Sequence, residues 1–120
     1  MPSLTIEDRT STGDPTGSIT LPDVPDGITL RELIRLRVRE EVARFNLRPL
    51  GIFTGLIGSV DANRQPIDWQ RQADTAIALF EASGYVVLVN GVQVTDLETR
   101  IRLREDLVVR FVRLTPLVGS

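Results

Sequence analysis

The stretch Leu107-Val-Val-Arg-Phe-Val-Arg-Leu114, followed by Thr115-Pro-Leu-Val-Gly-Ser120, decides how we expect the chain to fold and to end. Leu107, Val109 and Phe111 face one way in an extended chain while Val108, Arg110 and Val112 face the other, which is the two-residue period of a β-strand. Pro116 disfavours helical geometry in the residue before it. The sequence therefore predicts a last strand over 107–114 and an extended tail over 115–120.

A second strand is predicted immediately upstream of this stretch. Tyr85-Val-Val-Leu-Val89 is short and nearly all apolar, which is typical of a central strand buried on both faces. Asn90-Gly91 is the strongest two-residue hairpin signal, and Val92-Gln-Val94 begins the return strand. Residues 95–105 then read as a polar connection that holds a few apolar residues.

The first half of the chain predicts a hairpin and a helix. Leu4–Glu7 and Ser18–Leu21 alternate apolar and polar residues, as two hairpin strands do. Thr29 and Glu32 match a capping box, which marks the start of a helix. Apolar residues then recur at helical spacing and predict one stripe packed on the sheet: Leu30, Leu33, Ile34, Val38, Val42 and Phe45.

Residues 46–83 predict a long connection and a second helix. Loops of this length inside a compact domain are either functional or packed down by their own side chains, and Phe53, Leu56 and Ile57 favour the second, with a short helical turn as an option. Asp68 can cap the helix, and Ser83-Gly84 can end it. Its expected apolar face is Trp69, Ala73, Ala76, Ile77 and Phe80.

Composition narrows the function classes. A chain of 120 residues with 42% hydrophobic residues predicts one domain, and a formal charge of −2 argues against nucleic acid or an anionic membrane as a partner. Neither a membrane span nor a secretory signal is visible, so we expect a cytoplasmic protein. Cysteine and histidine are absent, which removes disulfides, thiol nucleophiles and the common zinc sites. An enzyme is the weakest hypothesis, because Asp61, Asp68 and Asp74 read as solvated charges.

All fourteen basic residues are arginine, and the chain contains no lysine. A GC-rich genome that favours arginine codons is the simplest interpretation. The alternative is functional, because a surface without lysine ammonium groups cannot accept isopeptide bonds on its side chains.

The predicted order of strand, strand, helix and further strands resembles the β-grasp arrangement of ubiquitin. The segment 106–119 is similar to the ends of the small sulfur carriers of molybdopterin and thiamine synthesis, and Val87–Gly91 is similar to their preceding strand and turn. Residues 46–83 have no counterpart in those carriers and look more like bacterial ubiquitin-like modifiers of Bub-type operons. The resemblance implies an α+β, ubiquitin-like β-grasp domain over 1–114, with a mixed sheet of four to five strands, one main helix and an inserted second helix.

The same resemblance implies a function for the tail. Gly119 would be activated by an ATP-dependent adenylating enzyme, which uses the ATP itself, and passed to a target, with a conjugating enzyme as a further partner. Ser120 departs from the family's second glycine, so a processing protease would have to remove it, unless it is an engineered replacement or the domain only binds. The residues expected to dock on the partner or to steer it by charge are Leu114, Pro116, Leu117, Val118, Arg110 and Arg113.

Two alternatives stay open. The first is a sulfur carrier in cofactor biosynthesis, which would use the same tail. The second is a noncovalent β-grasp interaction domain that uses the sheet face or residues 46–66 as its contact surface, and exposed Phe53, Leu56 or Ile57 would support it. With attachment at Gly119 and no lysine, the modifier hypothesis predicts single attachment, or attachment through the amino terminus.

Overall fold

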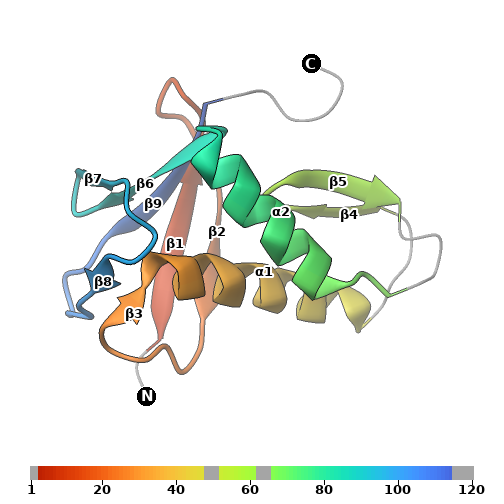
Figure 1. The fold of residues 1–120 in the computed structure, drawn as a ribbon, viewed down its shortest axis with the longest axis horizontal. Helices are drawn as coiled ribbons and strands as arrows, with labels where there is room; N and C mark the ends of the chain where they lie inside the picture. The colour runs from red at the N-terminus through yellow and green to blue at the C-terminus, as the bar shows by residue number, and fades with distance from the viewer. Residues whose placement is uncertain (1–2, 48–51, 62–65, 115–120) are drawn as a thin grey trace.

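The computed structural model describes residues 3–47, 52–61 and 66–114. Five strands form one mixed sheet in the order β2-β1-β9-β6-β7 (Figure 1). The strands are β1 (Leu4–Arg9), β2 (Pro15–Leu21), β6 (Tyr85–Val89), β7 (Val92–Val94) and β9 (Val109–Arg113). The fold is therefore α+β, with a mixed five-stranded sheet and two helices, as the sequence predicts, and it is compatible with a β-grasp.

The last strand lies at the centre of this sheet. β9 runs parallel to β1, with Ile6 beside Val109, and antiparallel to β6, with Val87 beside Phe111. The other neighbouring strands, β1 with β2 and β6 with β7, pair antiparallel. The strand begins at Val109, two residues later than the alternation predicts. A parallel pair formed by the first and last strands requires a crossover, and the helices supply it.

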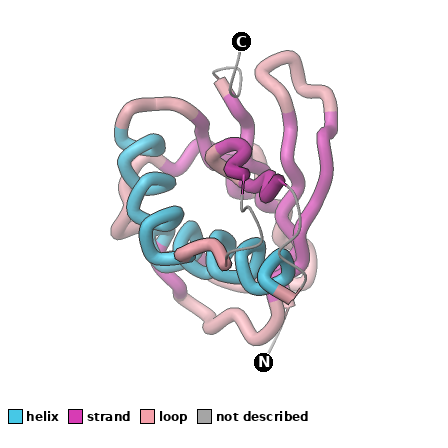
Figure 2. The backbone as a smooth tube through the Cα atoms, turned by 90° about the vertical axis from the view of Figure 1, so that its right-hand side faces the viewer, coloured by secondary structure: helices cyan, strands magenta, loops and turns pink. Residues whose placement is uncertain are grey.

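Both helices lie on one side of the sheet (Figure 2). α1 (Leu30–Asn46) begins at Thr29, whose side-chain hydroxyl accepts a hydrogen bond from the Glu32 backbone N–H at 3.2 Å. α2 (Trp69–Glu81) begins at Asp68, whose carboxylate accepts from two backbone N–H groups. Both predicted caps are confirmed. Ser83, with φ of 62°, supplies the left-handed residue after α2.

The prediction that Tyr85–Val89 is buried on both faces is wrong. Tyr85 and Val87 are buried under the helices, while Val86 and Leu88 are half-buried on the opposite face, which neither α1 nor α2 covers. β6 is also second from the edge, because β9 takes the centre. The residues of β6 are apolar on both faces, but only one face packs into the core, and the other lies on the uncovered side of the sheet.

The connection after α1 forms a hairpin and not a helical turn. β4 (Ile52–Gly55) and β5 (Gly58–Asp61) pair antiparallel beside the helices (Figure 1). Phe53 is buried and packs edge-on against Phe45, with ring centroids 5.3 Å apart, and Leu56 is buried as well. The insertion is therefore packed down by its own side chains, as predicted.

A second small sheet fixes the connection after β7. β3 (Ile28–Thr29) pairs antiparallel with β8 (Arg100–Ile101), and the side chain of Ile101 joins the hydrophobic core. Leu97 is buried in the same core. The predicted polar connection over 95–105 thus contains a short strand, which two residues are too few to reveal by periodicity.

Candidate functional site

The end of β9 is where the sequence places the functional tail. The backbone N–H of Leu114 donates to the carbonyl of Gly84 at 3.0 Å, so the strand stays tied to β6 up to its last described residue. The Leu114 side chain is 44% exposed. The other predicted tail residues lie outside the described residues: Pro116, Leu117, Val118, Gly119 and Ser120.

An apolar surface lies on the uncovered face of the sheet beside this exit. Val86 on β6 stands opposite Val112 on β9, and Leu88 stands opposite Arg110. These side chains alternate with the buried Val109 and Phe111, so they face away from the helices. We call the apolar members of this surface the open-face patch, which comprises Val86, Leu88, Val108, Val112 and Leu114.

Arg110 lies within this surface and is partly neutralised there. Its Nε donates to a Glu7 carboxylate oxygen at 2.9 Å, and Arg9 contacts the same oxygen at 3.2 Å. Hydrogen bonds from Arg110 and then Arg9 hold the pKa of the Glu7 carboxyl below its usual value of 4.5. The cluster has a net charge of +1 and borders the open-face patch.

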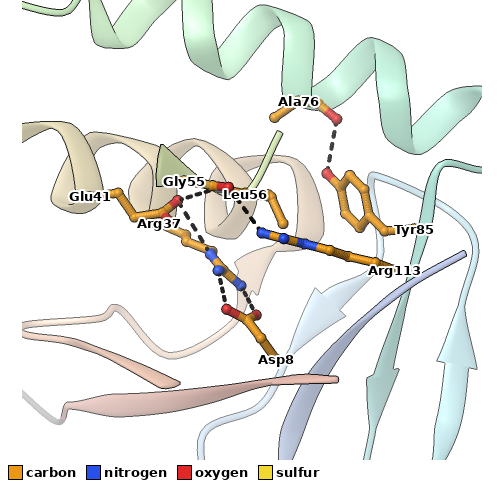
Figure 3. A network of polar contacts seen from close by, with 8 residues as sticks. All are labelled: Asp8, Arg37, Glu41, Gly55, Leu56, Ala76, Tyr85 and Arg113. Atoms are coloured by element: carbon orange, nitrogen blue, oxygen red, sulfur yellow. Dashed lines mark hydrogen bonds and ion pairs between the residues drawn. The ribbon is translucent and has the colours of Figure 1, made fainter. Parts of the chain in front are cut away.

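Arg113 points to the opposite side of the sheet from Arg110. Its guanidinium donates to the carbonyl of Gly55 at 2.9 Å, at the end of β4 (Figure 3). Burial lowers the pKa of Arg113. The structure therefore separates the two arginines that the sequence groups together: Arg110 lies on the uncovered face beside Glu7, while Arg113 ties the last strand to the inserted hairpin.

A buried ion network lies beneath Arg113. Arg37 on α1 is 1% exposed, and its guanidinium donates to both carboxylate oxygens of Asp8 at 2.5 and 2.6 Å (Figure 3). Its Nε lies 3.4 Å from the Glu41 carboxylate, and its guanidinium carbon lies 4.8 Å from the centre of the Phe111 ring. Burial alone would lower the pKa of Arg37, but the hydrogen bond to Asp8 and the charges of both carboxylates raise it instead. A buried guanidinium in this setting is stabilised by two anions and an aromatic face.

Glu41 connects this network to the insertion. Its carboxylate accepts from the backbone N–H of Leu56, the residue that follows β4, at 3.4 Å. Burial raises the pKa of the Glu41 carboxyl, and the charge of Arg37 opposes that rise. Helix α1, strand β1, strand β9 and the inserted hairpin therefore share one polar cluster near the exit of the tail.

The sequence carried a signal for this cluster that counting apolar residues missed. Arg37 and Glu41 fall between Leu33 and Phe45 at spacings of four residues, so they lie on the same stripe of α1 as the core residues. A charged pair inside an apolar helix stripe indicates a buried salt bridge when the strand packed against the helix also carries a charged residue. On β1 that residue is Asp8. Asp8 lies two residues after the buried Ile6 on β1, so both side chains face the helices.

A pH series tests the burial of Glu41. Because the pKa of its carboxyl is raised in the folded state, the folded protein binds this proton more tightly, and the contribution of Glu41 to the free energy of unfolding falls as pH rises from 4.5 through the folded pKa. We expect Glu41→Gln to remove that fall. Urea unfolding from about pH 3 to about pH 7 measures it.

Glu7 is the matched control with the opposite sign. Its pKa is lowered, so the stability that it contributes is present above 4.5 and is lost as pH falls through the folded pKa. Glu7→Gln should therefore flatten the acidic limb of the stability curve. A Glu41→Gln variant that changed the curve in the same direction as Glu7→Gln would contradict the assignment.

The inserted hairpin offers less contact surface than the binding-domain hypothesis requires. Phe53 and Leu56 are buried, and Ile57 is half-buried against the core. The exposure that would have supported residues 46–66 as an interface is therefore not found at these three positions. Apolar side chains that are partly exposed lie instead on the uncovered sheet face.

Within the described part of the chain, no group of three or more carboxylate, histidine or cysteine residues is arranged to hold a metal ion. Nor is any helix in that part long and apolar enough to cross a bilayer. Comparison with protein-family models, with curated proteins and with solved structures finds no match to this chain.

Proposed function

We propose that the chain is a ubiquitin-like β-grasp protein, a modifier or carrier that is activated at the carboxylate of Gly119. The observation that carries the proposal is the strand order β2-β1-β9-β6-β7, with the last strand parallel to the first at the centre of the sheet. A chain that leaves from a central strand presents its following residues from the middle of one end of the domain. That arrangement suits a tail that must enter the active site of another protein.

The only reacting group that this protein has to supply is the carboxylate of Gly119. The Gly119 carboxylate attacks the α-phosphorus of ATP in the partner enzyme, pyrophosphate leaves, and the resulting acyl adenylate passes its acyl group to a nucleophile as AMP departs. A glycine lacks the Cβ that would crowd such a reaction. Residues after Gly119 have to be removed first, so a processing protease belongs to the proposal.

The open-face patch and Arg110 would form the docking surface for the adenylating enzyme. Val112 lies two residues before Leu114 on the same face of the sheet, Val86 stands opposite Val112, and Leu88 extends this apolar surface beside Arg110. Apolar contact would supply affinity, and the net positive charge around Arg110 would orient an acidic partner during approach. In this proposal Arg113 has a different task, because it holds the end of β9 from the inside.

The first test compares two forms of the protein, one ending at Ser120 and one ending at Gly119. Each is incubated with ATP and an adenylating enzyme of the class that activates ubiquitin-like proteins, and the products are weighed by mass spectrometry. We expect an adenylate or a partner-linked adduct on the form that ends at Gly119 only. Gly119→Pro is the matched control, since it keeps the length of the tail and blocks close approach.

The outcome also separates the alternatives. A thiocarboxylate at Gly119 would favour the sulfur carrier, and an isopeptide-linked product would favour the modifier. No adduct on either form would contradict activation and leave the noncovalent interaction domain, which the partly exposed open-face patch independently favours. That second function predicts unchanged partner binding after residues 119 and 120 are deleted.

A further inference from the structure

Three arginines form a regular stripe along one extended segment. Arg100, Arg102 and Arg104 alternate with Ile101 and Leu103, and the three arginines are exposed while the two apolar residues turn inward. Alternate residues of an extended chain lie about 6–7 Å apart on one side. We call these three residues the arginine stripe.

The backbone beneath the stripe is held in place. β8 pairs with β3, and the Gly27 N–H donates to the Ile101 carbonyl at 3.0 Å. Asp26 accepts from the Leu103 N–H at 2.9 Å. Because the backbone of the segment is fixed before any partner arrives, little backbone conformational entropy is lost when the stripe binds one.

The charges of the stripe are weakly matched within the protein. Arg100 donates to a backbone carbonyl, that of Gly27, at 3.1 Å. Arg102 lies 3.7 Å from Asp26, with both side chains largely exposed. Arg104 has no side-chain hydrogen bond or ion pair within the described ranges. An anionic ligand would therefore find available guanidinium donors in a row.

Two hollows flank the stripe. One, of about 210 Å³, is lined by all three arginines together with Asn90, Thr99 and Leu107, and none of its described lining residues carries a carboxylate. The other, of about 470 Å³, lies on the far side of Arg104 and Leu107 and has an apolar lining from Leu4 and Leu103, with Glu105 at its wall. A positively charged hollow beside an apolar one fits a ligand that carries both kinds of group.

We propose that the arginine stripe binds an extended acidic peptide segment of a partner protein, with carboxylates at alternate positions and one apolar side chain in the hollow lined by Leu4, Leu103 and Leu107. Carboxylates at alternate positions of an extended peptide recur about every 6–7 Å, the repeat expected for side chains at alternate positions of the segment that carries the arginines. Nucleic acid fits less well for two reasons. An apolar hollow does not stabilise a phosphate group, and a protein of net charge −2 repels a long polyanion.

The stripe and the tail serve different partners. Leu107 lines both hollows and precedes the start of β9, whereas Leu114 lies at the other end of that strand. A peptide can therefore occupy the stripe while the tail lies in an activating enzyme. Binding at the stripe does not depend on activation at Gly119, so failure of one proposal leaves the other standing.

The test uses a fluorescein-labelled peptide of alternating aspartate and serine with one central leucine, titrated with the full chain and followed by fluorescence anisotropy. We expect saturable binding that weakens as salt is raised. The triple variant Arg100→Gln, Arg102→Gln, Arg104→Gln should bind at least about tenfold more weakly. Circular dichroism confirms that this surface variant remains folded.

The matched control removes three other exposed arginines, Arg39→Gln, Arg44→Gln and Arg71→Gln, and so has the same net charge. Its affinity should stay within about twofold of the wild type. Equal loss in both triple variants, or equal binding of the peptide with asparagine in place of aspartate, would overturn the proposal. Tighter binding of a single-stranded oligothymidylate than of the peptide would overturn it in favour of nucleic acid.

Discussion

Arg37→Met is expected to lower the free energy of unfolding by about 3–5 kcal/mol. Methionine retains an unbranched side chain of similar length on α1. It leaves the carboxylates of Asp8 and Glu41 without their cation in a buried site. It also removes the guanidinium from the face of Phe111. Urea unfolding at neutral pH measures the change.

Arg44→Met is the matched control on the same helix. Arg44 also pairs with a glutamate four residues away, Glu40, but its side chain is 53% exposed. Such a surface pair contributes about 1 kcal/mol or less. A loss at Arg37 no larger than the loss at Arg44 would contradict the buried network.

Removing the whole network distinguishes a missing cation from missing contact area. The triple variant Asp8→Asn, Arg37→Met, Glu41→Gln carries no buried charge, so it should be more stable than Arg37→Met alone. If the triple variant were as unstable as the single one, packing around Arg37 and not charge would be the cause. The packing of the Arg37 side chain, and not its charge, would then hold α1, β1 and the inserted hairpin together.

The strands and helices with strong periodicity were predictable from the sequence. The caps Thr29 and Asp68 and the Asn90-Gly91 turn each depend on contacts within a few residues, so local chemistry was sufficient to place them. β3, β4, β5 and β8 were missed, because strands of two to four residues show too few alternations to be distinguished from a loop.

The site was less predictable, since its geometry depends on distant pairings. Arg110 and Arg113 are three residues apart, so they fall on opposite faces of β9, and only the position of the helices decides which face is buried. The contact between Arg113 and Gly55 joins residues 58 positions apart, through an insertion whose path the sequence did not reveal. The apolar run in β6 gave the wrong burial because a strand buried on both faces and a strand with one partly exposed apolar face can have the same composition.

Phe111→Ala is expected to cost about 3–5 kcal/mol of stability, because it opens a cavity at the centre of the sheet. Phe111 is fully buried, and its ring stacks on Tyr85 with centroids 5.7 Å apart and lies under the Arg37 guanidinium. Urea unfolding measures the loss. A cost below about 1.5 kcal/mol would mean that the core closes around the missing ring.

Val112→Thr, one residue further along β9, is the control that separates stability from docking. Val112 is half-buried on the uncovered face, and threonine keeps its branched shape, so we expect a cost below about 1 kcal/mol. If the open-face patch receives the adenylating enzyme, Val112→Thr should weaken that binding although the domain remains folded. Full binding by Val112→Thr would remove the patch from the docking surface, and because the fold would be intact, instability could not explain the result.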